Sequence, residues 1–556
     1  MTAINPVTDF EIEDGIAIIT VDSPPVNALG HQVRLGIAGG LDRAFADEAI
    51  VAVVLICGGR TFFAGADINE FGKPLASPVL REIAQQMEGA GKPVVAAIHG
   101  AALGGGLETA LACHWRIAVP SAKLGLPEVK LGLLAGAGGT QRLPRLVGAG
   151  KALDMVVSGD PIDAVEAYDL GLIDALSEQD LRADAVRFAR DVAQGPQPLR
   201  RVRDMPPPQV QESLFVDFRN LHAERLKGFE APEASIRCIE AAVVEDFDEG
   251  MKIERRLFEE LMPGVQCAAQ RYLFFAEREA AKVSGLGKDT RLLPREVVGV
   301  RADMTIALEL ARRLRMAGIE PSSPIAACLE LDLMPVGAVG REVGGSNPEN
   351  VATVRFIPTM EAPTALEILR RPGMTDSALA TALAIAKRLG LACIVTLTGG
   401  NFIGQRMLET LASAVDHCVG DGLPKADLAA TADAFGISIA SRGHMLTGGR
   451  PLEGGAAQAV IERLVVPLVN EGARMLEEGA AARASDIDIA CVKAGMFKAY
   501  RGGPMFQAGQ IGLYRVIDAL IEHQQRWGDA HGPSPLLERI ALHGEALHES
   551  KGAIHG

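Results

Sequence analysis

The sequence predicts an α/β protein built from several domains, and two observations lead to this prediction. The chain has 556 residues, and domains hold roughly 150 residues each, so about three or four domains are expected. Apolar runs of strand length alternate with helical patterns in the first 190 residues, whereas helical patterns prevail in much of the rest. With 48% hydrophobic and 22% charged residues, the composition is typical of a globular protein.

The N-terminal region, residues 1–190, alternates strands with helices. Three apolar runs of strand length end in turn signals: IAIITV at 16–21, VAVVLICG at 51–58 and PVVAAIHG at 93–100. The stretch between the first two runs, GHQVRLGIAGGLDRAFADEA, has a helical pattern. This arrangement predicts a βαβ-type layout around a buried sheet.

The remaining chain divides into three regions that differ in their predicted secondary structure. Strand-like runs vanish after residue 190, and the proline-bearing stretch QGPQPLRRVRDMPPPQ is followed by long helical patterns, so residues 191–290 are predicted to form a helical connector. A second α/β stretch follows at 291–400. Residues 401–556 are predicted to be helical.

Charge, hydropathy and the chain ends exclude several classes of protein. Lys and Arg number 55 against 70 Asp and Glu, a net charge of −15, which argues against a protein that wraps nucleic acid or lies on an anionic membrane. The longest uncharged runs, 93–107 and 389–405, are shorter than the ~18 apolar residues of a membrane span. The opening MTAINPVTDFEIEDG has no secretory pattern, and the final AIHG is not a peroxisomal address.

The 8 cysteines include no CxxC pair and no Cys/His cluster at metal spacing. Reduced thiols in a cytoplasmic protein, and no bound metal, are therefore expected.

Two glycine-rich segments, RTFFAGADINEF at 60–71 and HGAALGGGLE at 99–108, carry the candidate chemistry. Both place small residues where a strand gives way to a turn and a helix, so backbone N–H groups are free to point at a ligand oxygen. Two such groups that converge on one carbonyl form an oxyanion hole. Glu108 and Glu128 lie at probable helix starts in mainly apolar contexts and are candidates for general acid and base work.

Each of these features also has a purely structural interpretation. A glycine-rich turn is usually only a turn, and a glutamate in the first turn of a helix usually complements the helix dipole. Either feature alone is more often structural. The two segments and the two glutamates occur together at a spacing that matches a known family, and this favours the functional interpretation over the structural one.

The chain resembles the crotonase (enoyl-CoA hydratase/isomerase) superfamily. Along its whole length it is similar to the multifunctional enzymes of fatty-acid β-oxidation, which fuse a hydratase/isomerase to a 3-hydroxyacyl-CoA dehydrogenase. The crotonase resemblance covers about residues 10–190 and implies a ββα-superhelix fold there. It runs through PPVNAL, AGADINEF, HGAALGGGLE, LGLPEVKLGLLAGAGGTQRLPRLVG and DALSEQDL.

The resemblance also implies roles for individual residues. Glu108 and Glu128 correspond to the two catalytic glutamates of hydratases, and Glu128 also to the proton shuttle of Δ3,Δ2-enoyl-CoA isomerases. Ala66 and Gly105 correspond to the donors of the oxyanion hole. The remaining positions expected to bind the substrate are Ala28, Asp67, Ile68 and Gly104.

The implied activity is hydration of 2-enoyl-CoA esters, isomerisation of 3-enoyl-CoA esters, or both, with coenzyme A present only as part of the substrate. Two alternatives stay open. The same enolate stabilisation serves other reactions of CoA thioesters, such as hydration followed by retro-aldol cleavage. A non-catalytic scaffold for other β-oxidation enzymes is a further alternative, although two intact glutamates argue against it.

The second half departs from the multifunctional family at its dehydrogenase positions. Arg355 stands where the family has a histidine, Glu367 keeps the glutamate, and Gln405 replaces an asparagine. The family's serine cannot be placed around AACLELDLM. The resemblance therefore implies all-helical dehydrogenase-type domains at 401–556 without dehydrogenase activity.

The nucleotide-binding fingerprint is also missing. A dinucleotide fold needs G-x-G-x-x-G after its first strand, whereas VVGV at 297–300 leads into Arg301, Ala302 and Asp303. Gly285, Gly287 and Thr290 in the preceding linker form only a weak fragment of such a motif. Residues 291–400 are thus predicted to be a truncated Rossmann-like remnant that does not bind NAD.

The protein is expected to be mainly monomeric. The connector segments ERRLFEELM and RYLFFAERE have apolar faces that need a cover. RGGPMFQAGQIGL and the helices around Met407 and Met475 are the expected cover, so the C-terminal half is predicted to stabilise the hydratase part.

Overall fold

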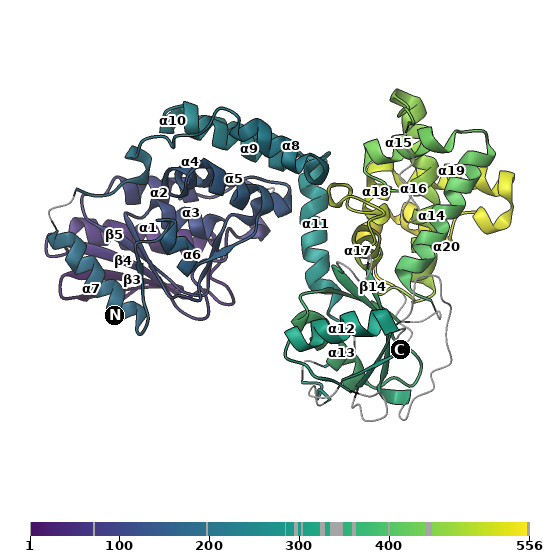
Figure 1. Ribbon diagram of the computed structural model, residues 1–556, viewed down its shortest axis with the longest axis horizontal. Coiled ribbons are helices and arrows are strands. Elements are labelled where there is room, and N and C mark those ends of the chain that lie inside the picture. The colour runs from purple at the N-terminus through teal and green to yellow at the C-terminus, as the bar shows by residue number, and fades with distance from the viewer. Residues whose placement is uncertain are drawn as a thin grey trace. The chain divides into compact units, whose positions relative to one another are not determined.

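The chain forms two compact units in a computed structural model, Met1–Ala268 and Ala269–Gly556, called here the N-terminal and C-terminal units (Figure 1). The structure describes residues 2–70, 73–195, 198–283, 285–287, 289–293, 298–301, 304–322, 329–333, 348–357, 363–397, 401–439 and 448–552. Within these ranges, no helix has the length and apolar character needed to cross a membrane. The predicted domain boundaries at residues 190, 290 and 400 remain predictions.

Some predicted features lie outside the described residues. These are Phe71 of the first glycine-rich segment, Ala302 and Asp303 after the strand of the nucleotide region, part of the segment in which the serine was sought (326–328 and 334), and the final AIHG.

A seven-stranded sheet forms the centre of the N-terminal unit. Its order is β1-β2-β3-β4-β5-β7-β10, antiparallel from β1 to β3 and parallel from β3 onward. The predicted apolar runs are its middle strands, which confirms the α/β prediction for this region. The strands are β1 (Thr2–Asn5), β2 (Thr8–Glu13), β3 (Ile16–Val21), β4 (Ala52–Cys57), β5 (Val94–Ile98), β7 (Trp115–Ala118) and β10 (Ala175–Leu176).

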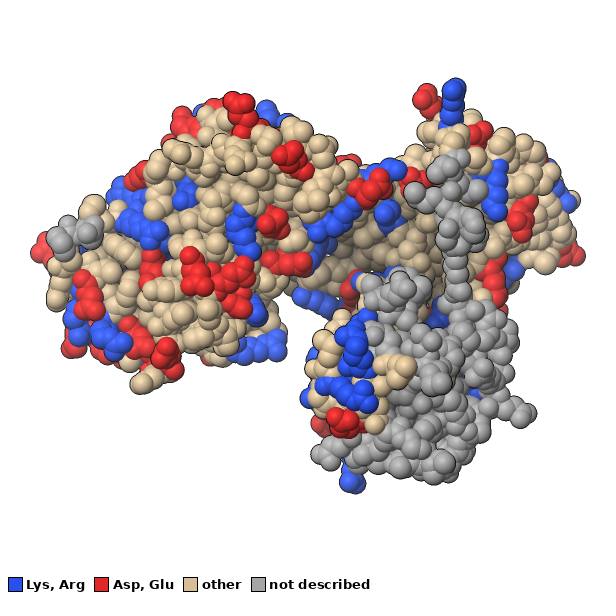
Figure 2. Space-filling view, viewed as in Figure 1, with Lys and Arg blue, Asp and Glu red and all other residues tan. Residues whose placement is uncertain are grey.

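Both faces of this sheet are buried, which explains why its strands are apolar throughout. Successive residues of β3 face opposite sides: Ile16 and Ile18 pack with helix α7 (Leu181–Gln194), whereas Ala17 and Ile19 pack with α1 (His31–Ala46) and α2 (Leu80–Glu88). Over the face shown in Figure 2, basic side chains of this unit are interspersed with acidic ones.

A second, three-stranded sheet positions the candidate site. Its order is β6-β8-β9, and β6 runs parallel to β8. Helix α3 follows β6 after one residue, and the 3₁₀ helix η2 follows β8 after one residue, so the starts of both helices lie at the same end of this parallel pair. The bounds are β6 (Ala101–Leu103), α3 (Gly105–Ala112), β8 (Lys123–Gly125), η2 (Pro127–Leu131), α4 (Gly139–Val147), α5 (Ala149–Ser158), β9 (Ile162–Asp163) and α6 (Ala164–Asp169).

The connector helices pack on the N-terminal unit, which corrects one expectation. Leu257 and Leu261, on the apolar face of the ERRLFEELM helix, belong to a buried cluster with Val129, Leu133 and Leu134 beside η2. This face is therefore covered within the N-terminal unit, and the expectation that the C-terminal half covers it is wrong. The connector elements are η3 (Val202–Asp204), α8 (Leu214–Leu226), α9 (Glu230–Val244) and α10 (Phe247–Leu261).

The C-terminal unit contains a six-stranded sheet in the order β12-β11-β13-β14-β15-β16. All neighbours are parallel except β14 and β15. Its elements are β11 (Val298–Arg301), α12 (Met304–Met316), β12 (Pro321–Ser322), β13 (Leu329–Leu333), η5 (Pro348–Asn350), β14 (Val351–Ile357), β15 (Ala365–Leu369), α13 (Asp376–Arg388) and β16 (Ala392–Thr396).

The rest of this unit is largely helical, as predicted. Helix α11 begins at Val265, and its later residues Leu273 and Ala276, in the RYLFFAERE segment, share a buried cluster with Met407 and Met475. The expected cover of this second segment is therefore confirmed. The elements are α11 (Val265–Ala280), α14 (Ile403–Gly420), α15 (Lys425–Phe435), α16 (Gly454–Glu477), α17 (Ala484–Lys493), η6 (Ala499–Arg501), α18 (Pro504–Ile511), α19 (Leu513–Trp527), η7 (Asp529–His531), α20 (Pro535–His543) and η8 (Leu547–Glu549).

Candidate active site

The pairing of β6 with β8 brings the two predicted glutamates into one neighbourhood. Leu103 at the end of β6 is in register with Gly125 at the end of β8, and the Gly104 N–H donates to the Gly125 carbonyl at 2.9 Å. The chain then enters α3, which carries Glu108 in its first turn, and η2, which carries Glu128. The same strand ends therefore fix both carboxylates.

Glu108 is buried, with 4% of its surface exposed. Its Oε1 accepts hydrogen bonds from the N–H groups of Ala137 at 2.7 Å and Gly139 at 2.9 Å. Burial raises the pKa of Glu108, and the two N–H groups oppose that rise because they stabilise the charged form. Glu108 is thus a buried carboxylate whose ionised form has dedicated donors.

Glu128 has the opposite environment. Its Oε2 is buried and has no hydrogen-bond partner among the described residues. Burial raises the pKa of Glu128 well above its usual value, and the nearby charge of Glu108 raises it further. The pKa of Glu128 is thus raised more than that of Glu108, so of the two neighbouring carboxyl groups Glu128 holds its proton more strongly and Glu108 ionises first.

Gly104 can only be glycine in this arrangement. Its φ is +53°, and a Cβ added to it would lie 2.8 Å from Oε1 of Glu128. Gly104 therefore lies against the Glu128 side chain, and its role in substrate binding stays a prediction.

The predicted oxyanion-hole residues are adjacent. A Cβ on Gly105 would lie 3.5 Å from the backbone N of Ala66, and one on Gly106 would lie 2.1 Å from the Phe63 carbonyl oxygen, so the two backbones are in close contact. Neither the Ala66 N–H nor the Gly105 N–H donates to any residue that the structure describes. The two N–H groups are therefore close together and have no acceptor in the described parts of the chain, which fits the predicted oxyanion hole.

The other predicted substrate-binding positions surround Ala66. Ala28 precedes Leu29, whose N–H donates to the Gly65 carbonyl at 2.9 Å. Asp67 accepts hydrogen bonds from the backbone N–H and the Nδ2 of Asn69, and so orders the 3₁₀ helix η1 (Ile68–Glu70), which begins at Ile68. The Asp67 carboxylate therefore has a local structural partner, and its role toward a substrate remains a prediction.

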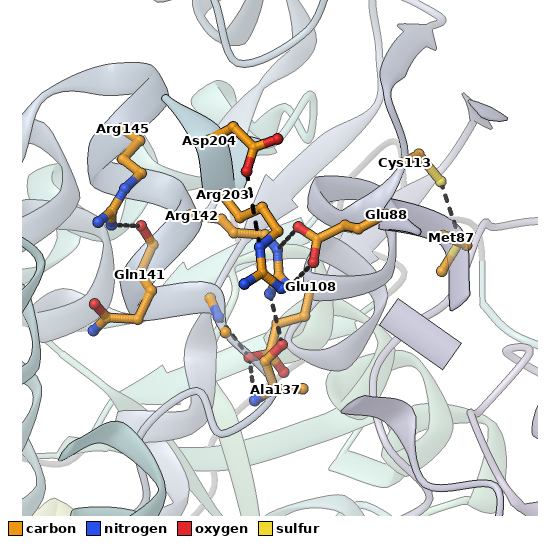
Figure 3. Close-up of polar contacts among 12 residues, drawn as sticks. Met87, Glu88, Glu108, Cys113, Ala137, Gln141, Arg142, Arg145, Arg203 and Asp204 are labelled. Carbon is orange, nitrogen blue, oxygen red and sulfur yellow. Dashed lines mark hydrogen bonds and ion pairs between the residues drawn. The ribbon is translucent and has the colours of Figure 1, made fainter. Parts of the chain in front are cut away.

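Three buried charged residues near Glu108 escaped the sequence analysis. The Arg142 guanidinium donates to both carboxylate oxygens of Glu88 at 2.8 Å and to the Ala137 carbonyl at 2.9 Å. Figure 3 shows Arg142 between Glu88 and Glu108. The third residue is Glu254 of α10, none of whose surface is exposed.

A sequence signal for Glu254 exists. It lies three and seven residues before Leu257 and Leu261, on the apolar face of an amphipathic helix, where a charged residue is unusual. The hydrogen-bond partners of the Glu254 carboxylate could not be predicted, because they are more than a hundred residues away in the sequence.

The three dehydrogenase positions contact one another in the C-terminal unit. Arg355 on β14 is in register with Glu367 on β15, and the two side chains form a buried ion pair at 2.9 Å. Arg355 also donates to Oε1 of Gln405 at 3.0 Å. Glu367 has no exposed surface and accepts further hydrogen bonds from Thr396 Oγ1 and the Gly404 N–H, each at 3.2 Å. These contacts form a buried polar network around a permanent cation, in which only the Nε of Arg355 has no hydrogen-bond partner among the described residues of the network.

No three His, Cys, Asp or Glu side chains come together as a metal site in the parts of the chain that the structure describes. The seven cysteines in these parts are free and buried.

Comparisons with known proteins identify similar sequences and structures. Residues 11–221 match the model of the enoyl-CoA hydratase/isomerase family. The chain is 29% identical over 698 residues to the peroxisomal bifunctional enzyme of Danio rerio, covering 96% of this chain and 97% of the relative. It is 42% identical over 277 residues to the peroxisomal bifunctional enzyme of Pongo abelii, covering 49% of this chain and 38% of the relative.

The first alignment is longer than the 556 residues of this chain, so the chain lacks stretches that the relative contains. Among solved structures, an enoyl-CoA hydratase from Bacillus anthracis is 27% identical, with a TM-score of 0.33 and coverage of 48% of this chain and 95% of that one. Residues 11–221 are therefore a domain of the enoyl-CoA hydratase/isomerase family, in a chain homologous over nearly its whole length to the multifunctional enzymes of β-oxidation.

Proposed function

We propose that the N-terminal unit hydrates 2-enoyl-CoA thioesters. The observation that carries this proposal is a pair of neighbouring carboxyl groups, buried Glu108 with two N–H donors and half-buried Glu128 with an unpartnered Oε2. Close to them lie two adjacent N–H groups that have no acceptor among the described residues. Family membership supplies the substrate class, acyl-CoA.

The oxyanion-hole step uses Ala66 and Gly105. Their N–H groups donate to the thioester carbonyl oxygen and stabilise the negative charge that develops on it, an effect worth several kcal/mol when the donors are preorganised. Withdrawal of electron density onto this oxygen makes the β-carbon electrophilic. The enolate that forms is then ready to accept a proton at the α-carbon.

The two glutamates divide the proton transfers. Ionised Glu108 takes a proton from water as the water oxygen bonds to the β-carbon, and neutral Glu128 gives its proton to the α-carbon. One water molecule is thereby added across the double bond. After the product leaves, the proton on Glu108 must return to Glu128, which restores the starting state.

Isomerisation of 3-enoyl-CoA is the second candidate activity of this site. It needs Glu128 ionised, because Glu128 must first remove a proton from the α-carbon and then return it to the γ-carbon. Burial and the charge of Glu108 oppose that ionisation. The geometry therefore favours hydration as the main activity near neutral pH.

We further propose that the C-terminal unit has lost dehydrogenase activity and does not bind NAD. The Arg355 guanidinium cannot accept a proton, and it occupies the carboxylate of Glu367 that would otherwise orient a histidine. The residues present thus do not fit hydride-transfer chemistry. Arg355→His alone should restore neither NADH binding by calorimetry nor oxidation of 3-hydroxyacyl-CoA, whereas micromolar NADH binding by the wild type would contradict the proposal.

Assays on 2-enoyl-CoA esters of increasing chain length test the proposed function. Formation of the 3-hydroxyacyl-CoA as the sole product supports hydration. Release of a shortened acyl-CoA and an aldehyde or ketone would indicate retro-aldol cleavage, and no turnover of any ester would indicate a scaffold. A mainly monomeric state and a cytoplasmic location remain proposals, although the relatives named above are called peroxisomal.

A further inference from the structure

The turn before helix α4 is held by two glutamates from opposite sides. The N–H groups of Ala137 and Gly139 donate to Glu108, and the N–H groups between and after them, those of Gly138 and Thr140, donate to Glu254 at 2.7 and 3.2 Å. Four successive N–H groups therefore alternate between a predicted catalytic carboxylate and a carboxylate of the connector.

The backbone of this turn explains the alternation. Gly138 has a φ of +98°, a left-handed conformation that lets neighbouring N–H groups point in opposite directions. Arg142 donates to the Ala137 carbonyl, and its Nη1 lies 1.8 Å from where a Cβ of Gly138 would be. The turn is thus held from three directions, by Glu108, Glu254 and Arg142.

Glu254 is also joined to the turn through a side chain. The hydroxyl of Thr140 contacts its Oε2 at 2.5 Å, and Thr140 Oγ1 accepts a hydrogen bond from Nε2 of Gln141 at 3.1 Å. Gln141 in turn donates to the carbonyl of Cys238 on α9. Two connector helices are therefore linked to the turn by hydrogen bonds.

We propose that Glu254 of the connector helix α10 is a positioning residue for Glu108. By holding the N–H groups of Gly138 and Thr140, it fixes the turn whose other two N–H groups hold the Glu108 carboxylate. Sub-ångström errors in the placement of a catalytic group are costly, and displacements of about 1 Å can lower rates about 10²-fold. This inference rests on the proposed function, since it assigns Glu254 a part in the same reaction.

If Glu254 acts on the site through its charge, its replacement changes the pH profile of kcat, which a purely structural role would leave unchanged. The charged and titratable groups coupled to Glu254 are Glu108 on α3, Glu128 on η2, Arg142 on α4 and Cys238 on α9, with Glu88 of α2 paired to Arg142. Burial raises the pKa of Glu254 to about 8, with the charge of Glu108 as the second cause. Once ionised, Glu254 raises the pKa of Glu128.

The direction of the pH effect follows. Below about pH 8, Glu254 holds a proton, and glutamine imitates its shape and neutrality. Above that pH, its negative charge helps Glu128 to keep the proton that hydration requires. Glu254→Gln removes this charge, so Glu128 loses its proton at lower pH and the basic limb of the kcat profile moves to lower pH.

The experiment compares the full-length wild type with Glu254→Ala, Glu254→Gln and the control Glu260→Gln, which changes an exposed glutamate of the same helix. Glu254→Ala should lower kcat for hydration about 10²-fold with little change in KM. Below about pH 8, Glu254→Gln should have most of the wild-type kcat, and the basic limb of its kcat profile should lie at lower pH than that of the wild type. The control should match the wild type in kcat, KM and pH profile.

The contrary results are distinct. A folded Glu254→Ala variant with wild-type kcat would overturn the positioning role. If the alanine variant does not fold, the basic limb of Glu254→Gln decides: a shift supports the role and an unshifted limb contradicts it. A wild type that hydrates no enoyl-CoA would contradict the proposed function instead.

Discussion

At the scale of single residues, Glu108 and Glu128 are the same residue type in two different environments. Glu108 receives two backbone N–H groups, whereas Oε2 of Glu128 receives none from the described residues. Burial penalises the charge on both, so the donors decide which carboxyl group ionises first. The proposed division into base and acid therefore rests on the backbone donors around Glu108.

The same difference predicts how the balance of activities changes with pH. Isomerisation requires ionised Glu128. Because the pKa of Glu128 is raised well above its usual value, its ionised fraction at a given pH is smaller than that of an ordinary glutamate and grows as the pH rises. The ratio of 3-enoyl-CoA isomerisation to 2-enoyl-CoA hydration should therefore increase from about pH 6 to about pH 9. Parallel assays on the two substrates measure it, and a ratio that falls with pH would reverse the assignment of acid and base.

Arg355 is the residue-scale feature of the C-terminal unit. Its ion pair with Glu367 is buried, so removing the cation leaves an uncompensated buried carboxylate. Arg355→Met should lower the free energy of unfolding of this unit by about 3–5 kcal/mol, and adding Glu367→Met should recover much of that loss. Urea unfolding of the three proteins tests this, and an unchanged midpoint for the single variant would show that the pair contributes little.

At the scale of elements, the parallel pair β6 and β8 determines the geometry of the site. Both strands end beside each other, and each is followed after one residue by a helix that carries one glutamate. Gly104 is the turn residue between β6 and α3, and it leaves no room for a side chain beside Glu128.

Gly104→Ala should therefore damage the site. The Cβ would lie 2.8 Å from Glu128 Oε1 at a φ of +53°, so both steric overlap and backbone strain of about 1–3 kcal/mol are expected. Hydration should fall by at least about tenfold, since each 1.4 kcal/mol of lost transition-state stabilisation is a factor of ten. Gly91→Ala is the control, because nothing lies within 4 Å of its added Cβ. Equal activity in the two variants would mean that Glu128 can move away without loss.

The sequence predicted elements and local motifs better than contacts between distant segments. The strands at 16–21 and 52–57 were visible as apolar runs, and the glycines and glutamates of the site as a motif with fixed spacing. Glu254 could not be assigned a role, because its partners Gly138 and Thr140 lie on another helix and only tertiary packing brings them together. The cover of α10 was misjudged for the same reason, since periodicity shows an apolar face but not what packs on it.

At the scale of the whole molecule, the chain has two units, each with its own core, and the position of a truncation should matter. The apolar faces of α9 and α10 are covered within Met1–Ala268, whereas Leu273, Ala276 and Ala280 of α11 are covered within the C-terminal unit. A protein of residues 1–268 should therefore be soluble and hydrate enoyl-CoA.

A protein of residues 1–282 keeps the later part of α11 without its cover and should aggregate or self-associate more readily. Light scattering and thermal unfolding of the two truncated proteins compare them directly. Insolubility or inactivity of residues 1–268 would mean that the C-terminal unit stabilises the hydratase after all, as the sequence alone suggested.

The central claim is that Glu108 and Glu128 carry proton transfer in enoyl-CoA hydration. The most direct measurement is kcat for 2-enoyl-CoA hydration in the wild type, Glu108→Gln and Glu128→Gln, since glutamine keeps the shape of each side chain but cannot exchange the proton. A loss of about 10²–10⁴-fold in each variant, with the thermal unfolding temperature preserved, is the predicted result. Full activity in either folded variant would contradict the account.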